Sequence, residues 1–201
     1  KGNFVITNNH VVLGAKKIAV RNGNGKVSKA IVAATSEKYD LAILKLDRPY
    51  KKFLASKDFT DPNPGTDVIS IGYPMSSIYG NDLPVITEGI ISKVYDDAAG
   101  IFLTTTKINA GNSGGPIFDL NGKLVGVSVS MLDTQKIQEL TGGALPTSMG
   151  VGIKSNMLKE VFKYKKTIPV RSVKNNKSKI YQDMLPKVVF IAVLGDDKNK
   201  K

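Results

Sequence analysis

The sequence predicts an all-β protein, and three features of its patterning support this prediction. The apolar residues fall in many short runs of strand length. Turn-forming residues separate these runs, including 19 glycines and 9 prolines among 201 residues. Asn-Gly pairs at 22–23 and 121–122 lie between apolar runs and predict β-hairpins. A chain of this length can bury a sizeable core as one large domain or two small subdomains.

The N-terminal part of the chain is expected to form four strands and a short helical turn. Asn8 and Asn9 follow the first strand and are turn formers that present His10, the only histidine of the sequence. Asp40 directly precedes the fourth strand. The predicted strands span 4–7, 17–21, 27–35 and 41–46, and the helical turn spans 11–15.

The rest of the chain continues the alternation of strands and turns. A polar stretch with three prolines, 47–64, is predicted to connect two groups of strands. Ser155 is expected to cap a closing helix that ends near Lys166; its apolar face holds Met157, Leu158, Val161 and Phe162. Further strands are predicted at 67–72, 85–94, 101–108, 117–120, 123–130 and 151–153, with a loop at 75–84 and an irregular insertion at 131–149.

Residues 109–116 form an unusual loop in which a serine is flanked by three glycines and followed by a proline. Such a loop can hold the Ser113 hydroxyl forward and turn backbone N–H groups into a small concavity, as an acyl-transfer nucleophile requires. His10 and Asp40 would supply a base and an acid that orients it. The plain alternative is a Gly-rich turn, a structural histidine and a turn aspartate.

Three segments resemble a known protein family. ITNNHVV (6–12), YDLAILKL (39–46) and NAGNSGGPIFDLNGKLVGV (109–127) resemble the catalytic segments of trypsin-like serine proteases, most closely the HtrA (DegP-like) branch. The resemblance runs in order from about residue 3 to about residue 163. It implies the chymotrypsin fold, with two six-stranded antiparallel β-barrels and a short C-terminal helix. The first barrel is expected to be incomplete, because the usual N-terminal strand is lacking.

The resemblance also implies a function, namely serine endopeptidase activity on polypeptide substrates, in particular unfolded or misfolded proteins. It implies that Ser113 attacks the peptide carbonyl, that His10 takes up the serine proton, and that Asp40 orients His10. The backbone N–H groups of Gly111 and Ser113 would form the oxyanion hole. No metal or organic cofactor is implied. The alternative function is a catalytically silent, protease-like module that binds peptides as extended strands.

Two further points concern specificity and mechanism. The loop also fits the Gly-x-Ser-x-Gly pattern of α/β-hydrolases, but that fold requires the histidine after the serine, and here it comes before.

Lys107, six residues before Ser113, stands at a position that often forms the floor of the specificity pocket in this superfamily. A buried lysine there would favour acidic substrate side chains, whereas an outward-pointing one would not, and both alternatives stay open.

Composition limits the other classes of function. The sequence has no cysteine, which excludes disulfides and thiol chemistry, and one histidine makes a catalytic zinc site of the usual kind unexpected. No apolar run approaches the roughly 20 residues of a membrane helix. Residues 1–153 carry 16 basic and 13 acidic side chains (+3), whereas 154–201 carry 13 and 4 (+9). The basic tail has no RNA-binding motif, so we expect a solvated lysine-rich segment and no specific nucleic-acid partner.

The domain prediction divides the chain into a trypsin-like protease domain (1–163), a basic linker (164–179) and a strand-containing tail (180–201). The resemblance allows an oligomer and favours a periplasmic or cell-envelope location, while the sequence itself determines neither. The segment after Lys166 is too short for the PDZ domain that many relatives carry.

The tail resembles a segment that belongs at the other end of the domain. Its residues 180–194, IYQDMLPKVVFIAVL, resemble the opening that normally precedes the histidine strand in HtrA-type domains. One hypothesis is a tandem array in which Ile180 starts the next protease unit. Another is a circular permutant that places 188–194 in its own first barrel. The absence of a Gly-Ser-Gly-Phe segment from both ends favours the tandem hypothesis. An unrelated amphipathic tail is the third possibility.

Overall fold

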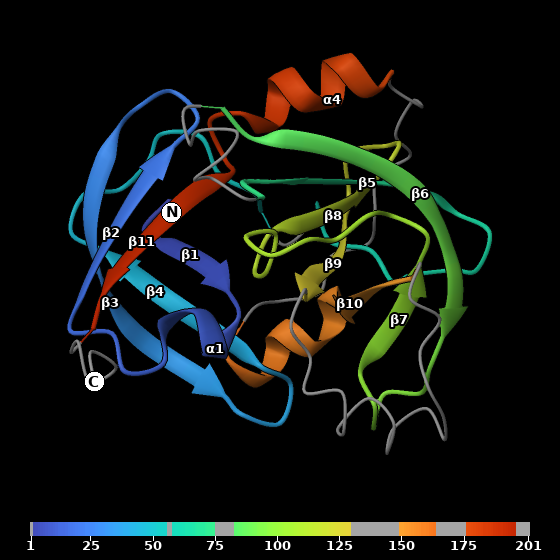
Figure 1. The fold of residues 1–201 in the computed structure, drawn as a ribbon, viewed down its shortest axis with the longest axis horizontal. Coiled ribbons are helices and arrows are strands. Elements are labelled where there is room, and N and C mark those ends of the chain that lie inside the picture. Colours follow the sequence, from blue (N-terminus) through green and yellow to red (C-terminus); the bar gives the residue numbers. More distant parts are fainter. Residues whose placement is uncertain (1, 56–57, 75–82, 130–148, 164–175, 196–201) are drawn as a thin grey trace, which may run out of the picture.

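The computed structural model of the chain describes residues 2–55, 58–74, 83–129, 149–163 and 176–195. Their strands form two antiparallel sheets that lie side by side, one open and one closed into a barrel (Figure 1). The predicted all-β architecture with an incomplete first barrel is therefore confirmed. Most of the predicted loop 75–84, of the insertion 131–149 and of the linker 164–179 lies outside the described residues.

The first sheet holds five strands, in the order β1-β4-β3-β2-β11. They are β1 (Phe4–Thr7), β2 (Lys17–Asn22), β3 (Val27–Ser36), β4 (Leu41–Leu46) and β11 (Val189–Leu194). The predicted hairpin between β2 and β3 is confirmed, since the Asn22 side chain accepts the backbone N–H groups of Asn24 and Lys26 at 3.1 and 3.0 Å. The helix after β1 is α1 (Asn9–Val12), which begins two residues before the predicted turn and includes His10.

The C-terminal strand β11 lies in the chain's own first sheet. It pairs antiparallel with β2, from Val189 opposite Asn22 to Leu194 opposite Lys17. The helix α4 (Lys177–Met184) precedes it. Within this chain, β11 thus takes the place that the circular-permutation hypothesis gives it. The physical reason is that β2 offers an unpaired edge, while the apolar side of α4 is buried in the main core.

The second sheet is a closed barrel of six strands, in the order β10-β7-β6-β5-β8-β9. They are β5 (Asp67–Gly72), β6 (Val85–Val94), β7 (Ile101–Thr104), β8 (Pro116–Asp119), β9 (Leu124–Val129) and β10 (Gly150–Lys154). Phe102 fills the interior against Gly126 and Gly152, where added Cβ atoms would come within 2.5 and 2.3 Å of its ring. The strand predicted over 101–108 is shorter, because the Thr104 hydroxyl accepts the Thr106 N–H at 3.1 Å and turns the chain.

A helix follows β10 where the closing helix is predicted, but Ser155 is not its N-cap residue. The structure has a 3₁₀ helix, η2 (Ser155–Glu160), whose N-cap residue is Lys154 and which has no side-chain cap there. The Ser155 hydroxyl instead donates to the Thr60 carbonyl at 2.7 Å and ties η2 to the connector between the sheets. The predicted apolar face is confirmed, since Met157 and Leu158 are buried.

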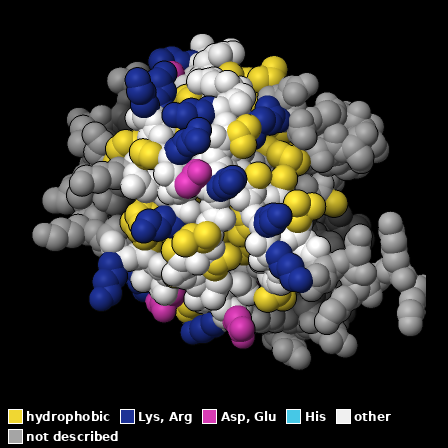
Figure 2. Space-filling view, turned by 90° about the vertical axis from the view of Figure 1, so that its left-hand side faces the viewer, with side chains coloured by type: hydrophobic (Ala, Val, Ile, Leu, Met, Phe, Trp, Pro, Cys, Tyr) yellow, Lys and Arg dark blue, Asp and Glu magenta, His cyan; other side chains and the backbone are white. Residues whose placement is uncertain are grey.

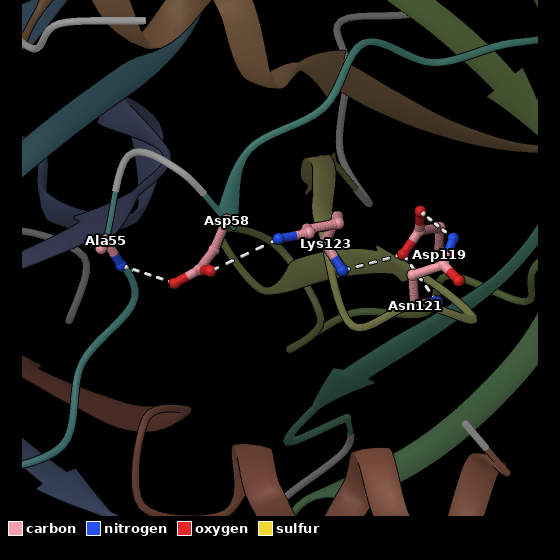
Figure 3. A network of polar contacts seen from close by, with 5 residues as sticks. All are labelled: Ala55, Asp58, Asp119, Asn121 and Lys123. Atoms are coloured by element: carbon pink, nitrogen blue, oxygen red, sulfur yellow. Dashed lines mark hydrogen bonds and ion pairs between the residues drawn. The ribbon is translucent and has the colours of Figure 1, made fainter. Parts of the chain in front are cut away.

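The connector is also fixed to the hairpin of β8 and β9 (Figure 3). Asp58 accepts the Ala55 N–H at 2.9 Å, and its other carboxylate oxygen lies 3.7 Å from the Lys123 ammonium. Within the hairpin, Asp119 accepts the backbone N–H groups of Asn121 and Lys123 at 2.9 and 2.8 Å. The second predicted hairpin is therefore confirmed. The Asp58–Lys123 contact thus fixes the hairpin that follows the serine loop to the connector.

The surface on the side of the first sheet is basic. The face turned toward the viewer in Figure 2 carries many Lys and Arg side chains, few Asp and Glu, and hydrophobic side chains between them. Strands β3 and β11 contribute exposed apolar residues, including Ile31 and Leu194. None of the helices in the described ranges is long and apolar enough to cross a membrane.

A chain that ends at Lys166 should lose most of its folded population. Ile180, Met184 and Val188 are 2%, 6% and 4% exposed within the main core. Each buried side chain of this size contributes about 1.5–3 kcal/mol, so their loss removes roughly 5–9 kcal/mol, against a typical stability of about 5–15 kcal/mol. Thermal unfolding followed by circular dichroism measures this effect. An unchanged melting temperature would show that β11 does not belong to this sheet.

Candidate active site

His10 and Asp40 meet at one end of the first sheet. The carboxylate of Asp40 makes two contacts with His10: Oδ2 lies 2.7 Å from Nδ1 of the ring, and Oδ1 accepts the backbone N–H at 2.9 Å. An ionised carboxylate only accepts, so Nδ1 carries the proton. In the neutral ring, Nε2 is then left as a proton acceptor. Both side chains are partly exposed, by 33% and 20%.

Asp40 is held in an unusual backbone conformation by the turn before His10. It is the only non-glycine residue of the described chain with positive φ, at 49°. Its carbonyl accepts the backbone N–H of Asn9 at 3.1 Å and the side-chain amide of Asn8 at 2.9 Å. The buried Asn8, predicted only as a turn former, therefore links the two catalytic candidates. Strain of this kind is typical of functional sites.

The serine loop is fixed by hydrogen bonds to itself and to β9. Asn112 N–H donates to Asn109, and Gly115 N–H donates to Asn112, each at 2.9 Å. Ser128 of β9 exchanges backbone hydrogen bonds with Gly114 and Gly115, at 2.9 and 2.8 Å. Its hydroxyl also contacts the carbonyls of Asn112 and Gly115. This role of Ser128 is not predicted from the sequence, where its one signal is a serine in the middle of an otherwise apolar strand.

Gly114 lies where the serine loop packs against the residues that precede His10. Its φ is +80°, and a Cβ atom there would lie 2.2 Å from the Thr7 hydroxyl and 2.9 Å from the Asn8 nitrogen. The loop of the second barrel thus touches the end of β1, which leads to His10. The absence of a side chain permits both the backbone conformation and this approach.

One cavity of about 480 Å³ collects most of the predicted site residues. His10, Gly111 and Ser113 line it, and Asp40 lies behind His10. Lys107 is exposed and lines a different cavity beside Thr87 and Lys177. The structure therefore places Lys107 at the surface and not at the floor of the site. No group of three or more His, Asp or Glu residues in the described ranges could hold a metal ion.

The arrangement provides the parts of an acyl-transfer site. An ionised acid orients an imidazole, and that imidazole shares a cavity with a hydroxyl on a Gly-rich loop. Gly111 and Gly114 have positive φ, 94° and 80°, on either side of Asn112 and Ser113. Such alternation of backbone conformation can turn successive N–H groups toward one point, as an oxyanion site requires.

Replacing Gly114 with alanine should lower both stability and activity. The added methyl group would force the loop away from Thr7, and a shift of about 1 Å can cost 10²-fold in rate. Gly25→Ala is the matched control, since Gly25 has a similar φ of +78° but no atom within 4 Å of the place that its new methyl group would take. Both melting temperature and peptide hydrolysis should be measured. Equal effects of the two variants would contradict the proposed contact between loop and strand.

Comparison with known families agrees with this geometry. Residues 1–127 match the family described as "Trypsin-like peptidase domain". The chain is 31% identical over 156 residues to the serine protease Do-like HtrB of Bacillus subtilis (strain 168), covering 72% of this chain and 33% of that protein. It is 32% identical over 159 residues to a probable periplasmic serine endoprotease, DegP-like, of Marinomonas sp. (strain MWYL1), covering 77% and 32%. The chain spans about a third of the length of these relatives.

Solved structures show the same relationship. A serine endoprotease from Yersinia pestis superposes with a TM-score of 0.60 at 26% identity, over 79% of this chain and 52% of that one. The HtrA-type protease AlgW, solved with a decapeptide, gives a TM-score of 0.59 at 27% identity, over 79% and 47%.

Proposed function

The chain belongs to the trypsin-like peptidase family and is HtrA-like, and on this premise we propose that it is a serine endopeptidase with His10, Asp40 and Ser113 as its catalytic triad. The observation that carries the proposal is the 2.7 Å contact of His10 Nδ1 with Asp40. Because Nδ1 of His10 contacts Asp40, Nε2 is the ring nitrogen that can accept a proton from a nucleophile. Ser113 lines the same cavity as His10 and is the hydroxyl of the Gly-rich loop.

The proposed reaction proceeds in two stages. Ser113 Oγ attacks the substrate carbonyl while His10 Nε2 takes the hydroxyl proton, and the C–N bond then breaks as His10 passes that proton to the leaving amine. Water releases the acyl group by the same steps. Asp40 stabilises the imidazolium formed at each stage. The N–H groups of Gly111 and Ser113 are proposed to bind the oxyanion, each worth about 2.7–4 kcal/mol.

The proposed substrates are unfolded polypeptides. The cavity beside Ser113 has a predominantly apolar lining that includes Phe59 and Phe118, side chains suited to the apolar segments that unfolding exposes. The Marinomonas relative is named as a probable periplasmic serine endoprotease, and we propose a periplasmic or cell-envelope location by analogy. The named relatives are longer proteins, so assembly into an oligomer stays a prediction.

The test compares one protein substrate in two states. Wild-type chain should cleave a reduced and alkylated protein rapidly and its native, disulfide-bonded form slowly, whereas Ser113→Ala should cleave neither. Cleavage of both states at the same rate would contradict the substrate class. Binding of the unfolded form without any cleavage by the wild-type chain would support the silent peptide-binding module instead.

A further inference from the structure

Positive charge is concentrated in the part of the chain that forms most of the first sheet. Residues 2–55, which contain β1 to β4, carry 10 Lys and Arg against 3 Asp and Glu (+7). One of these three acids, Asp40, faces His10. The described residues between 58 and 163, which form the connector, the second barrel and η2, carry 6 Lys and Arg against 8 Asp and Glu (−2). The two sheets therefore differ strongly in charge.

The inner strands of the first sheet have one buried face and one outer face. Ile18 and Val20 of β2 and Ala30 of β3 are buried in one core cluster. Because successive side chains of a strand point to opposite faces, the residues that alternate with these three point outward. We call the outer face of β2, β3 and β4 the basic face; it is formed by Lys17, Arg21, Val27, Lys29, Ile31 and Lys45.

Basic and apolar side chains alternate on the basic face. Val27 lies opposite Arg21, and Ile31 lies opposite Lys45, so the members of each pair share this face. Val27 and Ile31 are 53% and 65% exposed, and Lys29 is exposed between them along β3. Lysine side chains can lay their methylene stems along such apolar neighbours while the ammonium group stays at the tip.

The basic face is separate from the candidate active site. None of its six residues lines the cavity that holds His10 and Ser113. Figure 2 looks onto the side of the molecule on which β2 and β3 lie in Figure 1, and there Lys and Arg side chains outnumber Asp and Glu around hydrophobic ones. Asp47 is the acid at the border of this face, where its carboxylate accepts the Lys29 N–H at 2.9 Å.

The structure of this face indicates which anionic partner fits it. Strands β2, β3 and β4 are each paired on both sides, so the face offers no backbone edge to which a peptide strand could add. Nucleic-acid binding rests mainly on phosphate contacts, which leave exposed apolar side chains unused. The surface of an anionic bilayer matches both kinds of side chain, because its headgroups attract lysines and its acyl chains accept apolar groups.

We propose that the basic face is a docking surface for an anionic lipid bilayer. The three lysines contact the lipid phosphates, while Val27 and Ile31 enter the boundary between headgroups and acyl chains. The cavity beside Ser113 stays open in this orientation, because no residue of the basic face lines it. This inference goes beyond the proposed function and does not depend on Ser113 being a nucleophile.

Flotation with lipid vesicles tests the proposal on the full 201-residue chain. Phosphatidylcholine vesicles with roughly one third phosphatidylglycerol should bind the chain, whereas pure phosphatidylcholine vesicles should not. Each basic side chain near an anionic membrane contributes about fivefold to binding, so the loss of three should weaken it by about 100-fold. The variant of the basic face combines Lys17→Gln, Lys29→Gln and Lys45→Gln.

Two control variants remove the same number of charges elsewhere, and each should weaken binding by less than about threefold. The first changes exposed lysines outside the first sheet and combines Lys93→Gln, Lys107→Gln and Lys159→Gln. The second changes the basic end of the tail and combines Lys198→Gln, Lys200→Gln and Lys201→Gln. Comparison with these controls separates the basic face from the effect of net charge alone.

A further pair of variants tests the apolar part of the face. Ile31→Thr keeps every charge and the β-branched shape, and it should weaken vesicle binding by about fivefold. Ile90→Thr is the matched control on β6, where Ile90 is 42% exposed, and it should leave binding unchanged. All these positions are at the surface, where substitutions change stability little, and circular dichroism checks that each variant is folded.

Three outcomes would overturn the proposal. The first is equal binding to vesicles with and without phosphatidylglycerol. The second is binding by the variant of the basic face that equals that of either control variant; a loss in the tail variant alone would assign binding to the tail. The third is equal binding by Ile31→Thr and Ile90→Thr together with equally tight binding of double-stranded DNA, which would assign the face to polyanions in general.

Discussion

Ser113→Ala should abolish peptide hydrolysis, with a loss of turnover on the order of 10⁶-fold if the triad acts as a unit. The reason is that the loop offers the hydroxyl of Ser113 to the same cavity as His10, and alanine leaves no nucleophile there. Hydrolysis of a fluorogenic peptide measures the effect. Ser178→Ala, an exposed helix position on α4, is the matched control and should retain full activity.

The same pair of variants separates chemistry from folding. Both should unfold within a few degrees of the wild-type chain, since neither removes buried apolar volume. Undiminished hydrolysis by Ser113→Ala would contradict the assignment of the nucleophile. A large fall in melting temperature for this variant would make its inactivity uninformative, and the Asp40 variant then decides.

Asp40→Asn should lower turnover by about 10⁴-fold while leaving stability nearly unchanged. Asparagine tolerates positive φ as well as aspartate does, so the strained backbone at Asp40 is preserved. The amide can donate to Nδ1 of His10, which would move the ring proton to Nε2 and remove the base.

Asp47→Asn is the control for this substitution. The carboxylate of Asp47 also accepts a backbone N–H, that of Lys29 at 2.9 Å, but Asp47 does not line the cavity that holds His10 and Ser113. Turnover should be unaffected there. Similar losses in both variants would show that Asp40 acts only through the fold.

Much of the fold could be predicted because its signals are local. The predicted strand 41–46 has the same bounds as β4, because the apolar run directly after Asp40 is a local signal. Both hairpins are predicted from their Asn-Gly pairs. In the structure, the side chains of Asn22 and Asp119 accept backbone N–H groups of these turns. The candidate site residues are also marked by local patterns. His10 and Asp40, which contact each other, each stand at the end of a predicted strand.

The failures concern contacts between segments far apart in the sequence. Serine is a residue type that often caps helices, but the Ser155 hydroxyl donates to the Thr60 carbonyl, 95 residues away. The placement of β11 depends on an edge of β2 that no local pattern reveals. Ser128 and Asn8 hold the loop and the turn of the site through long-range hydrogen bonds. The direction of the Lys107 side chain likewise depends on how the strands are placed, which the local sequence does not determine.

The central claim is that Ser113 is a nucleophile activated by His10, and covalent labelling tests it most directly. A fluorophosphonate reacts with activated serines, and mass spectrometry of the digested protein locates the adduct. The account predicts one adduct on Ser113 in the native wild-type chain, and none in His10→Ala or in the denatured chain. An adduct on another residue, or equal labelling of Ser113 in the His10→Ala chain, would contradict it.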